Sequence, residues 1–153
     1  YFMQNLADVH GNDIVERGEI VAPAGEGEIS FVDARDVGAV AAAVLTEPGH
    51  ENVAYDVTGP EALDFHAVAS IFSDVLERQI TYPDPSLFAF GKRMRHRGLS
   101  PGYILLVSSI YTAVRLGFAG RVTNDTEKIL GREPRRIREY VEASAAEFRA
   151  EAD

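Results

Sequence analysis

The chain of 153 residues contains no cysteine and no tryptophan. The absence of cysteine excludes a disulfide-stabilised scaffold and a thiolate metal site, and it is typical of cytoplasmic proteins, which is the location we expect. The four histidines, His10, His50, His66 and His96, show no metal-ligand spacing, so we expect no metal site. No apolar run approaches the roughly 18 residues of a membrane span, and we expect no membrane partner.

Lysine is nearly absent as well, since 13 of the 15 basic residues are arginines. With 24 acidic residues the formal net charge is −9. Residues 1–83 hold 15 acidic and 3 basic side chains, whereas residues 84–153 hold 9 acidic and 12 basic ones. An acidic surface repels nucleic-acid backbones, so we do not expect nucleic acid as a partner.

Two basic segments, residues 92–97 and 132–138, are the only hint of nucleic-acid binding. We interpret them first as solvated helix faces, because the chain has no recognisable DNA-binding module. The alternatives are contacts with a cofactor 2′-phosphate, with a partner protein or with neighbouring acidic side chains.

A hydrophobic content of 46% is sufficient for a globular core. In residues 1–85 β-type runs alternate with helix-type runs. The predicted strands are 19–22, 28–32, 52–57 and 79–82, and the predicted helices are 2–10, ended by Gly11 and Asn12, then 37–45 and 65–76. Asp33 or Asp36 is expected to cap the second of these helices and Asp64 the third. Such alternation is typical of a parallel α/β sheet, against which the alanine-rich helix 37–45 would be buried.

After Pro85 the patterns are helical throughout. We predict a helix over 86–98 capped by Ser86 and another over 101–116 that starts at Pro101. A short helix capped by residues 123–125 follows, and a last one begins at Pro134. The sequence therefore predicts an α/β fold in two parts, residues 1–85 and a helical subdomain over residues 86–153.

Four parts of the sequence carry a family resemblance. They are Tyr1-Phe2-Met3-Gln4-Asn5, Phe31-Val32-Asp33-Ala34-Arg35-Asp36-Val37, Tyr55-Asp56-Val57-Thr58-Gly59-Pro60-Glu61-Ala62-Leu63, and the pair Thr123-Asn124-Asp125 and Leu130-Gly131-Arg132-Glu133-Pro134-Arg135. In this order and spacing, nearly the whole chain resembles the NmrA-like branch of the atypical short-chain dehydrogenase/reductase superfamily. The resemblance implies that residues 1–85 form the later half of a Rossmann-like parallel-sheet domain and that residues 86–153 form a helical substrate subdomain.

The resemblance also implies NAD or NADP as the cofactor of the full-length protein. In that family a Gly-rich turn at a helix start binds the pyrophosphate. No such turn occurs here, so we expect the chain to be the C-terminal portion of a longer protein and to be inactive by itself. The Tyr-x-x-x-Lys pair of typical short-chain dehydrogenases is absent too, because neither Lys92 nor Lys128 follows a tyrosine by four positions.

The implied function is NAD(P)H-dependent reduction of a small carbonyl or quinone-like substrate. The alternative is a non-catalytic regulator that senses NAD(P) and acts through a partner protein, since one fold can serve both roles. A protein partner or a homodimer is compatible with either function. No catalytic residue can be assigned from the sequence.

Tyr1, Phe2 and Asn5 are the candidate cofactor-binding residues. An asparagine amide offers both donors and acceptors to the amide of a nicotinamide ring, and concave sites combine aromatic side chains with a few polar groups. The alternative is structural, with Phe2 in the core and Asn5 bonded to a local backbone group.

The candidate substrate pocket draws on several elements. Its residues are Phe31, Asp33, Arg35, Thr58, Phe88 and Tyr103. Asp33 and Arg35 follow a predicted strand, where ligands bind in open α/β sheets, although helix capping and an ion pair explain them more simply. Thr58 belongs to a turn first and to a pocket wall second.

The aromatic residues of the helical part complete this pocket. The resemblance implies a substrate cleft between the sheet and the C-terminal helices, to which Phe88 and Tyr103, together with Phe90 and Tyr111, are expected to contribute. Core packing is the alternative role for each of them.

Overall fold

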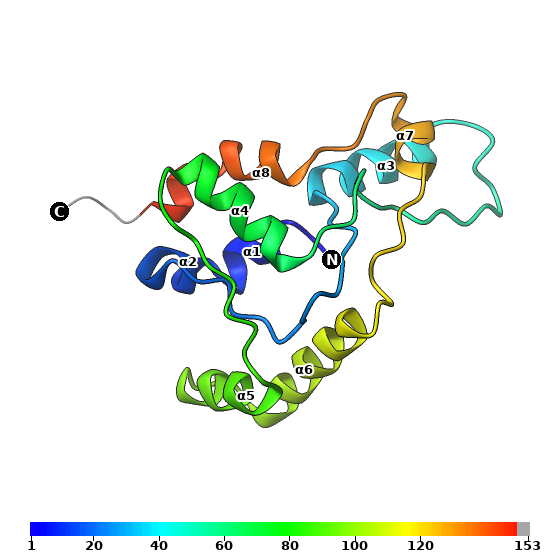
Figure 1. Cartoon of the computed structure of the whole chain (residues 1–153). Helices are drawn as coiled ribbons and strands as arrows, with labels where there is room; N and C mark the ends of the chain where they lie inside the picture. The colour runs from blue at the N-terminus through cyan, green and yellow to red at the C-terminus, as the bar shows by residue number, and fades with distance from the viewer. Residues whose placement is uncertain (150–153) are drawn as a thin grey trace.

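The computed structural model describes residues 1–149 as helices joined by extended segments (Figure 1). The elements are α1 (Asn5–Asp8), α2 (Gly11–Arg17), α3 (Ala34–Thr46), α4 (Phe65–Leu76), α5 (Leu87–His96), α6 (Pro101–Arg115), α7 (Asp125–Leu130), α8 (Ile137–Ala143) and the 3-10 helix η1 (Ala145–Phe148). Helix α4 packs on α8 and η1, α3 packs on α7, and α5 packs on α6 as a hairpin that lies below the other helices in Figure 1.

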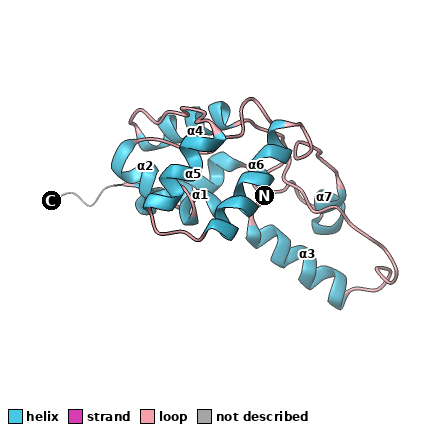
Figure 2. Ribbon diagram, turned by 90° about the horizontal axis from the view of Figure 1, so that it is seen from below, coloured by secondary structure: helices cyan, strands magenta, loops and turns pink. Residues whose placement is uncertain are grey.

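No strand is present among the described residues, and Figure 2 accordingly shows only helices and loops. The four predicted strands are therefore wrong for this chain. In their place are isolated bridges: Phe2 pairs with Val32 and Glu19 with Thr81 in parallel, and Ile29 pairs with Leu63 in antiparallel fashion. A β-ladder needs several successive residue pairs with a neighbouring strand. Two of the three bridges are parallel, but within residues 1–149 the extended segments lack partners along their length.

The N-terminal segment shows why the predicted helix over residues 2–10 is shortened to α1. The amide of Met3 donates to the Val32 carbonyl (2.9 Å), and the amide of Val32 donates to the Tyr1 carbonyl (3.0 Å). These bonds hold residues 1 and 2 alongside Val32, and Met3 begins the turn into α1. A second helix, α2, then begins at Gly11, where the sequence predicted a helix end, and terminates at Gly18 in the left-handed conformation (φ 65°).

The starts of the longer helices follow the predicted capping residues. Asp33 accepts a hydrogen bond from the Arg35 amide (2.8 Å) at the start of α3, and Asp64 accepts from the Ala67 amide (2.7 Å) at the start of α4. Ser86 accepts from the Ala89 amide (3.2 Å) and caps α5. These predictions are confirmed, as is Pro101 as the first residue of α6.

Two predictions about helices are wrong. The last helix, α8, begins at Ile137 rather than at Pro134. Helix α3 was expected to be buried against a sheet, but only Asp36 and Val40 are buried and Leu45 is 83% exposed. The sheet that α3 would cover has no partner strands here, and α7 is the helix on which α3 mainly packs. The connection that follows, residues 47–64, projects beyond α7 before it returns to α4 (Figure 1).

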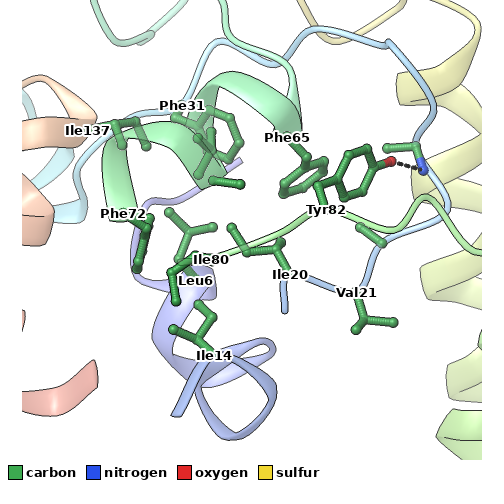
Figure 3. Packing of buried hydrophobic residues seen from close by; sticks show 14 of the residues in the cluster. Leu6, Ile14, Ile20, Val21, Phe31, Phe65, Phe72, Ile80, Tyr82 and Ile137 are labelled. Atoms are coloured by element: carbon green, nitrogen blue, oxygen red, sulfur yellow. Dashed lines mark hydrogen bonds between the residues drawn. The ribbon is translucent and has the colours of Figure 1, made fainter. Parts of the chain in front are cut away.

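The hydrophobic core lies between α4 and the extended segments around residues 20 and 80 (Figure 3). Phe65 and Phe72 of α4 are fully buried, and the Phe65 ring packs on the Tyr82 ring with centroids 5.5 Å apart. The Tyr82 hydroxyl accepts a hydrogen bond from the Ala24 amide (3.1 Å), the dashed line in Figure 3. This bond ties the two extended segments together where no ladder does.

Several large apolar side chains remain exposed in the α5–α6 hairpin, among them Phe88, Leu105 and Leu106 at 83%, 73% and 57%. Within residues 1–149 no helix combines the length and the apolar character needed to cross a membrane. The same residues contain no group of three or more His, Asp or Glu side chains arranged to hold a metal ion.

Candidate functional site

A cluster of three hydrogen-bonded rings lies where the first residues of the chain meet α6. The Tyr111 hydroxyl lies 2.9 Å from His10 Nε2 and 3.1 Å from the Tyr1 hydroxyl, which itself lies 3.3 Å from His10 Nε2. His10 and Tyr111 are each 1% exposed. The Tyr1 ring also packs edge-on against Phe31, with centroids 5.3 Å apart. The cluster fixes Tyr1 between the core and α6.

Burial keeps these three groups uncharged. It lowers the pKa of His10 to about 4, although Asp13 opposes the shift, and the nearby Arg97 lowers the pKa further. Burial raises the pKa of Tyr1 to about 12 and raises the pKa of Tyr111 well above its ordinary value. Neither phenol nor imidazole therefore changes its charge near neutral pH. The cluster positions side chains, and nothing in its electrostatics prepares it for proton transfer.

An ion cluster lies beside the three rings and joins α2 to α5. Asp13 is 1% exposed and pairs with Arg93 and with Arg97, whose Nη lies 2.6 Å from the carboxylate. Arg93 also contacts Glu19 at 3.3 Å. One oxygen of Asp13 is buried without a hydrogen-bond partner in the described part of the chain. A buried carboxylate is stable only when cations compensate it, so Asp13 holds both guanidinium groups in place.

A hollow of about 190 Å³ separates α1 and α2 from the α5–α6 hairpin. Its walls are mainly apolar, with a few polar residues; the lining residues are Asp8, Val9, Asn12, Met94, Arg97, Leu99, Tyr103, Ile104 and Val107. Tyr103, which is predicted to line a substrate pocket, is one of these lining residues. Small-molecule sites are concave and mostly apolar with few polar groups, and this hollow has that character.

A larger hollow of about 850 Å³ lies on the other side of α6, next to the turn Gly25–Glu28. Its surroundings are polar, because Asp84 accepts from the Gly25 amide (2.9 Å) and from Arg115 (3.3 Å). Burial opposes ionisation of Asp84, but the bonds from Gly25 and Tyr82 and the charge of Arg115 hold its pKa below the ordinary value. With carboxylates on its wall, this hollow is less suited to an aromatic ligand than the smaller one.

Asp33 and Arg35, two of the predicted pocket residues, are engaged in local hydrogen bonds and an ion pair. The Arg35 guanidinium binds both oxygens of Asp33, with the shorter distance 2.6 Å, and Gln4 donates to Asp33 at 3.1 Å. Burial opposes ionisation of Asp33, but these hydrogen bonds hold its pKa below the ordinary value. The neighbouring Asp36 is fully buried and pairs with Arg132 and Arg135. Capping and ion pairing account for both acids.

The remaining predicted residues are spread over the molecule. Phe31 lies in the core at 1% exposure, whereas Phe2 is 47% exposed and Phe88 is 83% exposed. Thr58 donates to the carbonyl of Thr123 and joins the turn before α4 to the segment before α7. The structure thus brings Tyr1 and Phe31 together and places Tyr103 at the hollow, while Thr58 and Phe88 lie elsewhere. Their assignment to a pocket stays a prediction.

The turn at residues 58–60 is shaped by a close backbone approach. A Cβ atom on Gly59 would lie 1.8 Å from the Phe31 carbonyl oxygen, so only glycine fits there. This contact places the turn directly against the segment that precedes α3.

The two basic segments bind neighbouring acidic residues. Arg93 and Arg97 pair with Asp13, and the segment 132–138 pairs with Asp36, Glu61 and Asp74. Of the alternatives that the sequence left open, contact with neighbouring acids is the one observed for these side chains.

His10, Asp13 and Arg97 were not singled out as site residues from the sequence. The i, i+3 spacing of His10 and Asp13 and the i, i+4 spacing of Arg93 and Arg97 place each pair on one helix face. This spacing can be read from the sequence, but it does not show that α2 and α5 lie next to each other.

The chain is similar to NAD(P)H-dependent reductases of known identity. It is 37% identical over 150 residues to an NAD(P)H azoreductase of Xenophilus azovorans, which covers 98% of this chain and 52% of the azoreductase. The structure matches the triphenylmethane reductase of Citrobacter in complex with NADP(H), with a TM-score of 0.79 and 28% identity, over 86% of this chain and 46% of the reductase. No protein-family model matches the chain.

The NADPH-dependent quinone oxidoreductase of Escherichia coli, in complex with NADPH, shares the fold at lower identity. Its TM-score is 0.86 at 23% identity, over 94% of this chain and 50% of the oxidoreductase. The chain spans about half the length of the curated relatives that it matches. The fold is therefore that of about half of a Rossmann-like reductase, although the parallel sheet is not formed within residues 1–149. The half-length coverage fits the expectation of a longer protein.

Within residues 1–149 the starts of the long helices do not fit the phosphates of a dinucleotide. Free amide groups at a helix start bind a pyrophosphate. In α3, α4, α5 and α6, the described helices of more than seven residues, a side chain already caps the first turn, and in α3 and α4 that side chain is a carboxylate. We therefore derive no chemical step through the cofactor from these residues.

Proposed function

We propose that this chain is the substrate-side part of an NmrA-like, NAD(P)H-dependent reductase of small carbonyl or quinone-like molecules. The observation that carries the proposal is the 37% identity to an NAD(P)H azoreductase over 98% of the chain. The likeness to a triphenylmethane reductase complexed with NADP(H) supports the same cofactor class. A second half, with the phosphate-binding turn, would supply the dinucleotide site.

The unpaired extended segments support a second half. Phe2 and Val32, and likewise Glu19 and Thr81, pair in parallel, which is the pairing of Rossmann-like sheets. Parallel sheets are covered by helices on both faces. The exposed helix α3 would cover one face of the completed sheet. Added strands would turn the single bridges into ladders.

In the proposed enzyme this chain binds the substrate and one end of the cofactor. The cluster of Tyr1, His10 and Tyr111 holds the N-terminal segment in place, so that Phe2 and Asn5 would face the nicotinamide ring. Tyr103 and Arg97 lie at the apolar hollow beside it. Their side chains would contact the substrate, while the second half would hold the phosphates of the cofactor.

The test uses the full-length protein and follows NADPH and NADH oxidation with a benzoquinone, an azo dye and a triphenylmethane dye. We expect oxidation of NAD(P)H with at least one of these acceptors, and no NADPH binding by residues 1–153 alone. Cofactor binding without turnover would favour the sensing regulator instead. Absence of both binding and turnover would refute both functions.

Two variants of the full-length protein test whether Asn5 contacts the cofactor. Asn5→Ala should weaken NADPH binding about fivefold, because one hydrogen bond to a neutral amide contributes on the order of 1 kcal/mol. Asn124→Ala is the matched control, since the Asn124 side chain makes no capping bond at α7. If Asn5→Ala lowers the melting temperature equally with and without NADPH, Asn5 has a structural role.

A further inference from the structure

The hollow between α1–α2 and α5–α6 has the size of one aromatic ring. Its volume is about 190 Å³, and its apolar lining includes Val9, Met94, Ile104 and Val107. A cavity of roughly 150 Å³ lined by aliphatic side chains binds benzene. The hollow therefore has room for one ring with a small substituent, and a dye of two or three rings could insert one of them at most.

Arg97 gives this hollow a fixed hydrogen-bond donor. Its side chain is 30% exposed, and one Nη lies 2.6 Å from the buried Asp13. Within residues 1–149 the guanidinium has no further ion-pair or hydrogen-bond partner, so its remaining N–H groups are free for a ligand. Asp13 acts as the positioning residue, because this ion pair holds one end of the guanidinium at the buried carboxylate.

The charges around the hollow disfavour an anionic ligand. The positive charges of Arg93 and Arg97 are already compensated by Asp13 and Glu19. Asp8, which lines the hollow, adds a third carboxylate. An incoming carboxylate or sulfonate would meet these acids without a free cation. A neutral carbonyl oxygen needs only a donor, which Arg97 supplies. Tyr103 also lines the hollow, and a tyrosine hydroxyl can donate a second hydrogen bond.

We propose that this hollow binds a single neutral aromatic ring that carries a carbonyl oxygen. The oxygen accepts from Arg97 and the ring packs between Val107, Ile104 and Met94. The proposal rests on the proposed function and narrows it to monocyclic quinones and aromatic ketones or aldehydes as the substrates that fit this chain.

The test measures binding to the full-length protein without cofactor, by calorimetry and ligand-observed NMR. The probes are acetophenone, ethylbenzene, which lacks the acceptor, and benzoate, which is anionic. Acetophenone should bind at least about tenfold more tightly than either, as one hydrogen bond to a charged donor allows. Equal binding of acetophenone and ethylbenzene, or tighter binding of benzoate, would overturn the proposal.

Two variants locate the site. Arg97→Leu should reduce acetophenone binding to the level of ethylbenzene, and Val107→Phe should fill the hollow and abolish binding of both. The matched controls are Arg138→Leu and Val53→Phe, which change exposed side chains away from the hollow. If Val107→Phe does not fold, Val107→Ala enlarges the hollow and should shift preference toward larger ring substituents. Unchanged binding in Arg97→Leu would overturn the assignment.

Failure of this site and failure of the proposed function give different results. Acetophenone binding that depends on Arg97 in a protein that never oxidises NAD(P)H would retain the ring site and refute the reductase. Benzoquinone-dependent NADPH oxidation with the same KM in Arg97→Leu would retain the reductase and refute the ring site.

Discussion

His10 and Asp13 lie one helical turn apart and are both buried, but they are accommodated in opposite ways. His10 is neutral and bonds to two phenol hydroxyls. Asp13 pairs with Arg93 and Arg97 as a carboxylate. The first arrangement depends on pH in the mildly acidic range, because a proton that the unfolded chain accepts readily is excluded from the folded one.

The expected result is a loss of stability in mild acid. The folded pKa of His10 is about 4 against 6.5 for an ordinary histidine, so its contribution is complete above pH 6.5 and is lost as the pH falls toward 4. In that range the free energy of unfolding should decrease by on the order of 1 kcal/mol per pH unit on account of this residue. Urea denaturation followed by circular dichroism at several pH values measures it.

His10→Gln is the control, because glutamine keeps a hydrogen-bonding group for Tyr111 and does not titrate. Its unfolding free energy should vary less steeply between pH 6.5 and 4 than that of the wild type. Identical slopes would show that His10 is not the group responsible.

At the scale of elements, the helices are largely predictable and the extended segments are not. Local signals place the helix starts, since Asp33, Asp64 and Ser86 cap the helices that the sequence predicts for them. A predicted strand forms only when it pairs with a neighbouring strand. Such neighbouring strands are not present in residues 1–149. The family resemblance predicts Tyr103 at a substrate pocket; its side chain lines a hollow, and its role there stays a prediction. The pairing of Asp13 with Arg97 could not be predicted, because it depends on how α2 meets α5.

The cap of α4 should contribute measurably to stability. Asp64→Ala removes the bond to the Ala67 amide and should lower the free energy of unfolding by about 1 kcal/mol. Ser70→Ala, at an exposed position of the same helix, should change it by less than about 0.5 kcal/mol. Equal effects of the two substitutions in urea denaturation would show that the cap is not used in solution.

For the molecule as a whole, stability is unevenly distributed. Helix α4 lies at the centre, with α8, η1 and the core residues around it. The segments around residues 19–32 and 79–85 pass through the core with few backbone hydrogen bonds to each other. Side-chain packing and single bonds such as that from the Ala24 amide to Tyr82 hold them.

Hydrogen exchange should reveal this difference. Amides of residues 19–32 and 79–85 in the chain by itself should exchange roughly tenfold or more faster than those of α4, because local opening there breaks few bonds. In the full-length protein the same amides should become protected as strands form. Mass spectrometry of peptic fragments resolves the segments, and equal protection in both proteins would argue that no sheet is added.

The long connection between α3 and α4 has a use in protein engineering. Residues 47–49 are exposed, and the outer part of the connection projects away from α4 and beyond α7 (Figure 1). Exposed loop tips with few backbone contacts accept foreign sequence. A fluorescent domain or an affinity tag inserted between Pro48 and Gly49 would therefore leave the helices intact, and it would provide the optical label that a chain without tryptophan and cysteine does not offer.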